Sequence, residues 1–530
     1  MDLEFNQGFD ILIISNDHIS QEKVLKQNVE ALRGVCINKD ALVIFVTEDW
    51  PRGAGTGLGP IYAFHKAYNI AKNDHSTDLL ERLMNGASVA IYYTIGENRK
   101  LAPLLLTELN NKSLIKLPGY CDDQTQQSQL TLLSALIKQS SIYANNLKGR
   151  VNIFSGEQLF LPFGKPSFQP KHKVEIFSLS IPFPTEKEWN QHSLEKHTII
   201  VKDAAGKSIL LDKIDYATLQ EIVSKGKIEP AMGLAISAGA ISLSGFFWGS
   251  LLQECKHELQ YREGKLHANE HFWMPLTLDE ETYIALMKKK GTIYPVAKGH
   301  YIRRKRFIDA FAPPRETAHL IGLLDIGPEN YLFDFCTVKS YFTSNLKLTS
   351  DTEEGKLLRD FYGLRNASEI NSNLDCDKES ILVNCRIKSG QIKNSVLFNV
   401  EAEHVDISNS MIINSNLKTL DADSCLVYEV HSSEELKLEP NTVRVDFDLM
   451  GVKDYVPLYT QFNRDGEEDW KQTIPPNPSS FDEIVDSFKK LEEIKIAPMH
   501  GVPDLYRIMT TAADRKYKVL SKPKNPDSSK

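Results

Sequence analysis

Short apolar runs alternate with helical patterns along the first third of the chain. Strands are predicted at residues 10–15, 41–47 and 88–94. Helices are predicted between them, at residues 21–32, 60–71 and 77–85. Strands separated by helices are typical of βαβ units, so we expect an α/β fold with a mostly parallel sheet. Further strands are predicted at residues 151–154 and 320–326, and such a sheet binds its ligands at the carboxyl ends of its strands.

The pattern changes beyond about residue 365, where short apolar pieces recur at a fixed interval. Four pieces align: ESILVNC from residue 379, NSVLFNV from 394, NSMIINS from 409 and DSCLVYE from 423. Their serines, at positions 380, 395, 410 and 424, are 15, 15 and 14 residues apart. A repeat of this length is too short for a pair of helices and matches one coil of a parallel β-helix. An ordinary β-sandwich with coincidental spacing is the alternative.

One long stretch, AMGLAISAGAISLSGFFWGSLL at residues 231–252, carries no charge. It is long enough to span a bilayer, but it contains four glycines and four serines. The alternative is a buried strand that turns through Gly239 into a core helix. That helix would bury Phe246, Phe247, Leu251 and Leu252. We favour this second interpretation and expect no membrane association.

Composition narrows the classes of function. A chain of 530 residues is expected to form two or three domains. Its net charge of −8 argues against a chain built to bind nucleic acid. Seven cysteines without a CxxC pair suit a reducing compartment, so we expect free thiols and a cytoplasmic protein. The first residues, MDLEFNQGFD, lack the basic and apolar regions of a signal peptide.

A glycine-rich loop lies at residues 48–64, EDWPRGAGTGLGPIYAF, with glycines at 53, 55, 57 and 59. A P-loop would need Lys and Ser or Thr after Gly59, and the dinucleotide fingerprint would need glycine at Leu58. Backbone N–H groups at a helix N-terminus can still bind a phosphate, and Arg52 and Lys66 could add positive charge. A phosphate site and a flexible turn are both compatible with this loop.

Two further segments, IGENRKLAP at 95–103 and LNNKSLIKLPG at 109–119, follow the third predicted strand. Together with the glycine-rich loop, this pattern resembles the sugar-1-phosphate nucleotidyltransferases, and within them the GDP-fucose pyrophosphorylase branch. The segments SGEQLFLP at 155–162 and DIGPENYLFDFCTVKSYFTSNLKL at 325–348 are similar to later motifs of that family. The resemblance covers roughly residues 8–430.

The resemblance implies a Rossmann-like nucleotidyltransferase domain over residues 1–365 and a short left-handed parallel β-helix over residues 366–445. We expect a helical extension with a disordered tail over residues 446–530. In that extension Ser480 and Glu483 are predicted to form a capping box. An apolar stripe follows it, at Phe481, Ile484, Val485, Phe488 and Leu491.

The implied reaction joins a nucleoside triphosphate to a sugar 1-phosphate and releases pyrophosphate, with Mg²⁺ as cofactor. The residues that match the family's catalytic positions are Arg99, Lys100 and Lys112. Those that match its nucleotide-binding positions are Gly53, Gly55, Thr56, Gly57, Gly59, Gly96 and Lys116. The metal ligands would be Glu157 and Asp334, although Asp334 could instead cap a helix that starts near Val338.

Three departures from the family pattern fall at these positions. The family's Gly-Thr-Arg triplet is replaced by Asn98-Arg99-Lys100, its usual aspartate by Glu157, and a glycine by Cys336. An altered enzyme and a non-catalytic descendant that binds nucleotide or sugar phosphate therefore both remain open. No motif identifies the sugar or the base.

Other classes are weaker. HANEH at residues 267–271 fits the inverted zinc-peptidase pattern H-x-x-E-H, but no third ligand is evident. A β-helix also occurs in acyltransferases of the hexapeptide type, which have longer and more regular coils. An exposed end of the β-helix would favour a homo-oligomer.

Overall fold

The computed structural model describes residues 8–50, 53–96, 99–122, 128–155, 157–162, 168–262, 272–311, 320–327, 331–364, 374–431, 435–448, 455–464 and 466–487. The chain divides into two compact units. The first, here called the α/β unit, comprises Met1–Gly96, Gly119–Phe335 and Thr352–Arg365. The second, here called the repeat unit, comprises Glu97–Pro118, Cys336–Asp351 and Asn366–Lys530. Two segments that precede the expected boundary at residue 365 therefore belong to the same unit as the 15-residue repeat.

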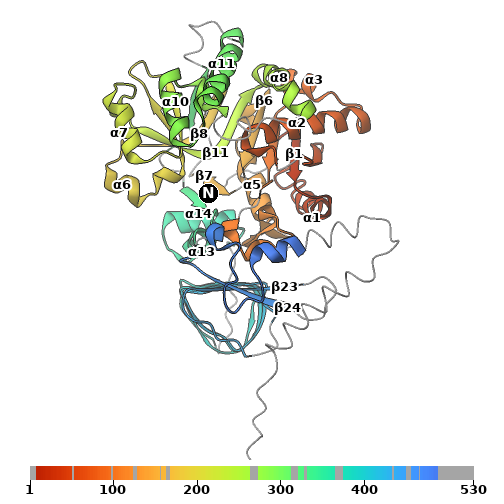
Figure 1. Ribbon diagram of the computed structural model, residues 1–530. Coiled ribbons are helices and arrows are strands. Elements are labelled where there is room, and N and C mark those ends of the chain that lie inside the picture. Colours follow the sequence, from red (N-terminus) through yellow and green to blue (C-terminus); the bar gives the residue numbers. More distant parts are fainter. Residues whose placement is uncertain are drawn as a thin grey trace, which may run out of the picture. The chain divides into compact units, whose positions relative to one another are not determined.

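A mixed sheet forms the centre of the α/β unit (Figure 1). Four neighbouring strands are parallel, in the order β2 (Leu42–Thr47), β1 (Ile11–Asn16), β3 (Val89–Tyr93) and β6 (Arg150–Ser155). The sheet continues through strands that pair mostly antiparallel: β11 (Leu234–Ser244), β8 (Val174–Ile181), β9 (Thr198–Lys202), β10 (Ser208–Asp212) and β12 (Ile321–Asp325). The predicted strands at 10–15, 41–47, 88–94, 151–154 and 320–326 are confirmed.

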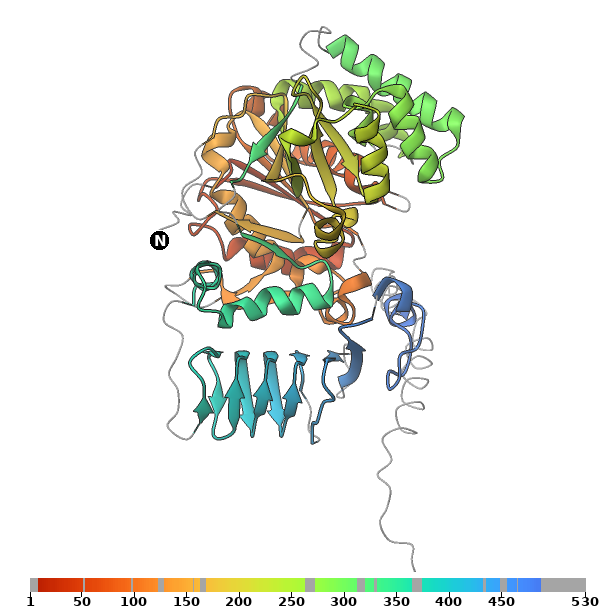
Figure 2. The same ribbon diagram turned by 90° about the vertical axis from the view of Figure 1, so that its left-hand side faces the viewer.

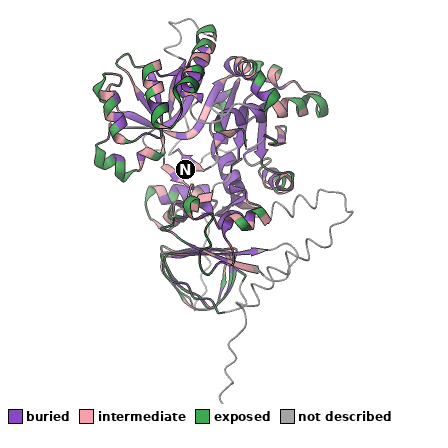
Figure 3. Ribbon diagram, in the orientation of Figure 1, coloured by how far each residue is buried: buried purple, intermediate pink, exposed green. Residues whose placement is uncertain are grey.

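Helices cover both faces of the parallel strands. The helices of the α/β unit are α1 (Ile19–Glu30), α2 (Gly55–Asp74), α3 (Leu79–Met84), α5 (Leu132–Ser141), α6 (Glu186–Gln191), α7 (Tyr216–Ser224), α8 (Gly245–Glu254), α9 (Lys256–Tyr261), α10 (Glu280–Lys289), α11 (Tyr294–Phe311) and α14 (Glu353–Phe361). Ile13, Ile44 and Ile91 lie side by side in the parallel register and pack in one core with α2 and α8. On the other face, the Tyr92 hydroxyl hydrogen-bonds Ser140 of α5. Successive residues alternate between two buried faces, which explains the continuous apolar runs (Figure 3).

A second core lies between β9, β10 and the helices α7, α10 and α11. Ile199, Leu211, Leu219 and Tyr283 are fully buried in it. It extends the α/β unit away from the parallel strands without contributing to their carboxyl ends.

The uncharged stretch 231–252 forms β11 and α8 within this unit. The strand does not end at Gly239 but passes through it with a change of register between Ser237 and Ile241. In α8, Phe247 is buried as expected, whereas Phe246 is 61% exposed. In the part of the chain that the structure describes, no helix has the length and apolar character needed to cross a membrane.

Parallel strands spaced by 15 residues form most of the repeat unit (Figure 2). One sheet contains β15 (Ile381–Val383), β16 (Arg386–Ile387), β18 (Val396–Glu403), β20 (Met411–Lys418), β22 (Leu426–Tyr428), β23 (Thr442–Asp448) and β24 (Tyr455–Gln461). A second contains β14 (Asp375–Cys376), β17 (Gln391–Lys393), β19 (Asp406–Ser408) and β21 (Asp421–Asp423). Val396 pairs with Met411, and Met411 with Leu426, so each step advances by one repeat.

An asparagine ladder runs along the repeat. The Nδ2 group of Asn384 donates to Asn399 Oδ1 at 2.8 Å, Asn399 donates to Asn414 at 3.0 Å, and Asn414 donates to Glu429 at 2.7 Å. All four residues have φ between 48° and 54°. Asparagine tolerates this left-handed conformation better than most residues, so one residue type supplies both the turn and the ladder.

A second ladder joins backbone to hydroxyl. The N–H of Ser395 donates to Ser380 Oγ, that of Ser410 to Ser395 Oγ, and that of Cys425 to Ser410 Oγ. The fourth member is therefore Cys425 rather than Ser424, and the structural period is 15 residues at every step. None of the described cysteines forms a disulfide.

The remaining described elements are short. They are α4 (Leu104–Thr107), β4 (Lys116–Tyr120), β5 (Gln129–Thr131), α13 (Val338–Leu346) and α15 (Gly466–Asp469). In the segment expected to be a helical extension, β24 is a strand that pairs antiparallel with β23. The predicted capping box of Ser480 and Glu483 is present. Phe488, Leu491 and the predicted disordered tail lie outside the described residues.

Replacing Asn399 tests the asparagine ladder. Asn399→Ala removes two hydrogen bonds and places a Cβ-bearing apolar residue at φ 54°. We expect it to lower the free energy of unfolding by about 2–3 kcal/mol, in urea denaturation of the full chain. Asn399→Gly removes the same hydrogen bonds without the backbone strain, so it should be about 1 kcal/mol more stable than Asn399→Ala. An Asn399→Ala protein as stable as the unmodified one would contradict the ladder.

Candidate functional site

The parallel strands β2, β1, β3 and β6 end at one edge of the sheet, here called the carboxyl edge. The chain passes from β1 to β2 on one side, and β3 then lies on the other side of β1. Such a reversal of strand order opens a crevice at the carboxyl ends of the strands, where α/β proteins bind ligands. The residues that follow these strands therefore define the candidate site.

The glycine-rich loop follows β2 and leads directly into α2. Gly53 and Gly55 have φ of 79° and 72°, which favours glycine at both positions. The helix begins at Gly55, five residues before the predicted start at Pro60. Gly55, Thr56 and Gly57 therefore form the first helical turn, whose N–H groups have no acceptor within the helix. Gly53 and Thr56 are exposed, so the loop is accessible from solvent.

Gly59 has a packing role. A Cβ atom on Gly59 would lie 2.1 Å from the hydroxyl oxygen of Tyr93 and 2.2 Å from its Cζ. Tyr93 is the last residue of β3 and is 3% exposed. The absence of a side chain at position 59 thus allows α2 to lie directly on the end of β3.

Glu48, the first residue after β2, binds the start of α2. Its Oε1 accepts the N–H of Ala54 at 2.6 Å, and its Oε2 accepts the Tyr93 hydroxyl at 2.9 Å. Burial raises the pKa of Glu48, the charges of Asp17 and Asp49 raise it further, and these two hydrogen bonds oppose the shift. A side-chain carboxylate therefore occupies part of the anion-binding end of α2.

The basic side chain expected to assist the loop is already paired. Lys66 donates to Asp49 Oδ1 at 3.0 Å and to the Thr47 carbonyl at 2.8 Å. Arg262 lies 3.3 Å from Asp49 Oδ2, and the Tyr62 hydroxyl donates to Asp49 as well. Arg52 lies outside the described residues.

Asn16, the last residue of β1, is fully buried at the same edge. Its Nδ2 donates to Thr47 Oγ1 at 3.1 Å and to the His18 carbonyl at 2.6 Å. Its Oδ1 has no hydrogen-bond partner among the described residues. A buried acceptor without a donor is uncommon in a folded protein.

The two predicted metal ligands belong to the same unit. Glu157 follows β6, and Asp334 ends β13 (Tyr331–Asp334), which pairs with β7 (Gln158–Leu161). Asp334 is opposite Gln158, and the Phe335 N–H donates to the Glu157 carbonyl at 2.8 Å. Asp334 does not cap α13, because Thr337 is the N-cap residue. The alternative role considered for Asp334 is therefore wrong.

These two residues suit a magnesium ion in donor type. Mg²⁺ usually takes one or two protein carboxylates and completes its shell with water and substrate phosphates. In the described parts of the chain, no group of three or more His, Cys, Asp or Glu side chains gathers as a metal site. Two carboxylates on neighbouring strands are compatible with the substrate-dependent kind of site only.

The predicted cations Arg99, Lys100, Lys112 and Lys116 all belong to the repeat unit. Lys100 lies 3.2 Å from Glu467, and the Arg99 guanidinium lies 5.6 Å from the Trp470 ring centroid. Lys112 is 8% exposed. Gly96 is exposed and belongs to the α/β unit, and Asn98 lies outside the described residues.

Lys116 is the centre of a buried polar cluster in the repeat unit. Its ammonium group lies 2.6 Å from Glu429 and 3.3 Å from Glu108. Tyr428 donates to Glu108 at 2.6 Å and accepts the backbone N–H of Lys116 at 2.8 Å. Burial opposes the charge of Lys116, but the two carboxylates outweigh it and raise its pKa. The asparagine ladder thus ends in a charged cluster.

Sequence reasoning missed Glu48, Asn16 and Tyr93. A signal was present, because Asn16 and Glu48 are polar residues directly at the ends of buried apolar strands. The motif HANEH lies at residues 267–271, outside the described residues, and stays untested.

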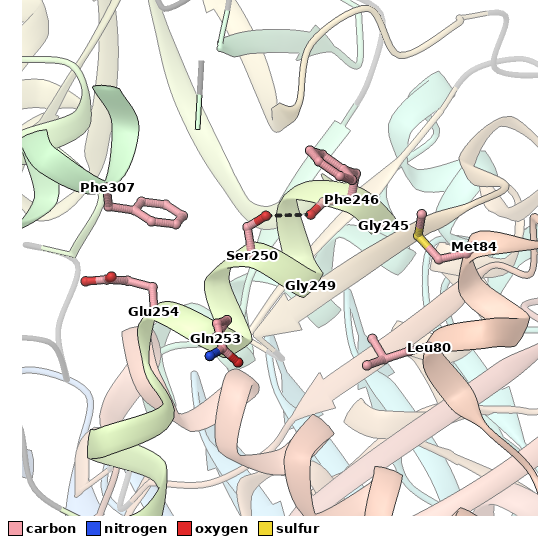
Figure 4. Close-up of a pocket in the computed structure, with 9 residues that line it drawn as sticks. All are labelled: Leu80, Met84, Gly245, Phe246, Gly249, Ser250, Gln253, Glu254 and Phe307. Carbon is pink, nitrogen blue, oxygen red and sulfur yellow. Dashed lines mark hydrogen bonds between the residues drawn. The ribbon is translucent and has the colours of Figure 1, made fainter. Parts of the chain in front are cut away.

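A shallow apolar groove of about 600 Å³ lies elsewhere on the α/β unit (Figure 4). Phe246 and Ser250 of α8, Met84 of α3 and Phe307 of α11 contribute to its wall. None of the predicted site residues lines it. It contains few polar groups, so it does not replace the carboxyl edge as the candidate site.

Gly59→Ala tests the close contact of α2 with β3. We expect it to lower the free energy of unfolding by about 1–3 kcal/mol, because the added methyl group overlaps Tyr93. Gly299→Ala in α11 is the matched control, since a Cβ there meets nothing within 4 Å. It should raise stability by about 0.5–1 kcal/mol, and equal effects of the two changes in thermal denaturation would refute the packing role.

Lys116→Met tests whether Lys116 stabilises the fold. The change leaves Glu108, which is 6% exposed, without its cation, so we expect a loss of about 3 kcal/mol at neutral pH. Because the pKa of Lys116 is raised, its contribution is complete below the ordinary value of 10.5 and is lost as the pH rises through the raised value. The difference from the unmodified protein should therefore shrink only above about pH 10.5.

Lys100→Met is the control for this measurement, because its partner Glu467 is 64% exposed. It should change stability by less than about 0.5 kcal/mol. If Lys116→Met were equally mild in urea denaturation, the cluster would not stabilise the repeat unit.

Comparison with known proteins adds no assignment. No protein-family model matches the chain, and no curated protein matches it. Any statement of function therefore depends on the residues and geometry described above.

Proposed function

We propose that the chain is a sugar-1-phosphate nucleotidyltransferase that joins a nucleoside triphosphate to a sugar 1-phosphate and releases pyrophosphate. One observation carries the proposal. The glycine-rich loop, Gly96 and Glu157 follow three strands that end at the same edge of the sheet, beside the reversal of strand order. The resemblance assigns these segments to nucleotide and metal binding, and the fold supports it by bringing them to one edge.

We further propose that the repeat is a left-handed parallel β-helix that follows a Rossmann-like domain. The constant step of 15 residues in both parallel sheets supports one coil per repeat. Ile392, Ile407 and Ala422 occupy equivalent positions in one core with Leu397 and Ile412, as stacked coils require.

In the proposed reaction, a phosphate oxygen of the sugar 1-phosphate attacks the α-phosphorus in line. The bond to the β-phosphate breaks, and pyrophosphate leaves with the electron pair. The N–H groups of Gly55, Thr56 and Gly57 would hold phosphate oxygens, since they form the free N-terminus of α2. Glu157 and Asp334 would hold Mg²⁺, which supplies positive charge to neutralise the phosphates.

A second function is favoured by the cations of the repeat unit. Lys100 and Lys116, which match catalytic and nucleotide-binding positions of the family, are engaged by Glu467 and by Glu108 and Glu429. A side chain that is neutralised in this way contributes little charge to a triphosphate. A non-catalytic descendant that binds nucleotide or sugar phosphate is therefore the alternative.

Pyrophosphate release separates the two functions. Full-length protein with Mg²⁺ is tested with each of the four nucleoside triphosphates against glucose, mannose, galactose and fucose 1-phosphates. We expect release with one pair, and a decrease of about a hundredfold or more in Glu157→Gln and Asp334→Asn.

Glu221→Gln is the control for these two variants, because Glu221 pairs with Lys225 and Lys289 on the surface of α7. It should leave the rate unchanged. Protein that is folded, binds nucleotide and releases no pyrophosphate with any pair would establish the non-catalytic alternative.

A further inference from the structure

Hydrogen-bond acceptors dominate the part of the carboxyl edge between β1 and β2. The backbone N–H of Glu48 donates to the Asn16 carbonyl at 2.9 Å, so the two side chains start from adjacent strand ends. Asp17 is exposed next to them. The cations Lys66 and Arg262 pair with Asp49. A ligand at this place must therefore supply donors and cannot depend on these two cations.

We propose that Glu48 and Asn16 form a subsite that accepts hydrogen bonds from the hydroxyl groups of a sugar, either the ribose of the nucleotide or the ring of the sugar 1-phosphate. This subsite rests on the proposed function, because it names which part of a substrate faces β1 and β2. It adds residues that the glycine-rich loop and the metal carboxylates do not include.

The Glu48 carboxylate is held in one orientation and retains acceptor capacity. A carboxylate offers about four lone-pair positions. Ala54 and Tyr93 each use one position, on different oxygens. Glu48 is partly exposed, so the remaining positions are within reach of a ligand. Donors that fix a carboxylate from behind prepare it for a ligand in front.

Asn16 provides an independent indication of a ligand. Its side chain is fully buried, and its Nδ2 is turned to Thr47 on β2 and to the His18 carbonyl. Oδ1, on the other branch of the amide, is therefore turned away from β2 and has no donor among the described residues. A hydroxyl group of a bound sugar would satisfy this acceptor.

A hydroxyl suits this place better than a phosphate does. The Glu48 carboxylate already accepts from Ala54 at the N-terminus of α2, and a phosphate beside it would be repelled by Glu48 and Asp17. The N–H groups of Gly55, Thr56 and Gly57 lie one turn further along the helix. A sugar phosphate or nucleotide can thus place a hydroxyl at Glu48 and a phosphate at these amides. The carboxylate would fix the direction in which the substrate lies.

Equilibrium binding tests the subsite separately from turnover. Full-length protein is titrated by calorimetry with ATP, GTP, CTP and UTP, and the best binder is compared with its 2′-deoxy and 3′-deoxy forms. In the second arm, glucose, mannose, galactose and fucose 1-phosphates are titrated, and the best is compared with its ring-deoxy analogues. We expect one arm to show a loss of about tenfold or more for a single missing hydroxyl. The arm that shows it identifies the source of the hydroxyl.

Variants assign that loss to Glu48. In Glu48→Gln the discrimination should fall to about twofold or less, because the charged acceptor is lost. Tyr93→Phe keeps the carboxylate but removes one of its donors, so it should give an intermediate discrimination even if Glu48→Gln folds poorly. Glu221→Gln should bind as the unmodified protein does.

The outcomes separate the subsite from the function. Binding without discrimination in both arms, or discrimination unchanged in both Glu48→Gln and Tyr93→Phe, would overturn the subsite and leave the proposed function intact. Failure of the unmodified protein to bind any nucleotide or sugar phosphate would overturn the proposed function and the subsite with it.

Discussion

Parallel strand pairing is the constraint on which both units depend. A parallel neighbour cannot be reached by a tight hairpin, so the chain must return to the same end of the sheet between two strands. In the α/β unit helices make this return, and the ends of β2, β1, β3 and β6 consequently meet at one edge. In the repeat unit the return takes place within 15 residues. The same requirement thus produces a collected site in one unit and a regular stack in the other.

The second requirement is that buried polar groups find partners, and carboxylates satisfy it in both units. Glu429 accepts the last asparagine of the ladder and the ammonium of Lys116, whereas Glu48 accepts an N–H at the start of α2 and the hydroxyl of Tyr93. In each case a carboxylate ends a row of donors. These contacts join residues far apart in the chain, as from position 116 to 429.

The sequence predicted the strands well, because each buried strand is a continuous apolar run with polar residues at its ends. It misplaced the start of α2, since three glycines lower helix propensity, and the contact of Gly59 with Tyr93 cannot be read locally. It chose Ser424 over Cys425, because residue type was used where the ladder depends on a backbone N–H. Glu48 and Asn16 were missed because their partners come from other strands. The resemblance identified the loop and Glu157, but not the ion pairs that engage Lys100 and Lys116.

The glycines of the loop illustrate why a motif is a composite signal. Gly53 and Gly55 are required by positive φ, Gly57 belongs to the first turn of α2, and Gly59 is required by the side chain of Tyr93. Tyr93 in turn holds Glu48, which binds the N–H of Ala54. The loop is therefore positioned from behind by the glycine that is furthest from solvent. A phosphate site and a hydroxyl site can share one loop only if something fixes which N–H groups face each of them, and this chain of contacts is what fixes it.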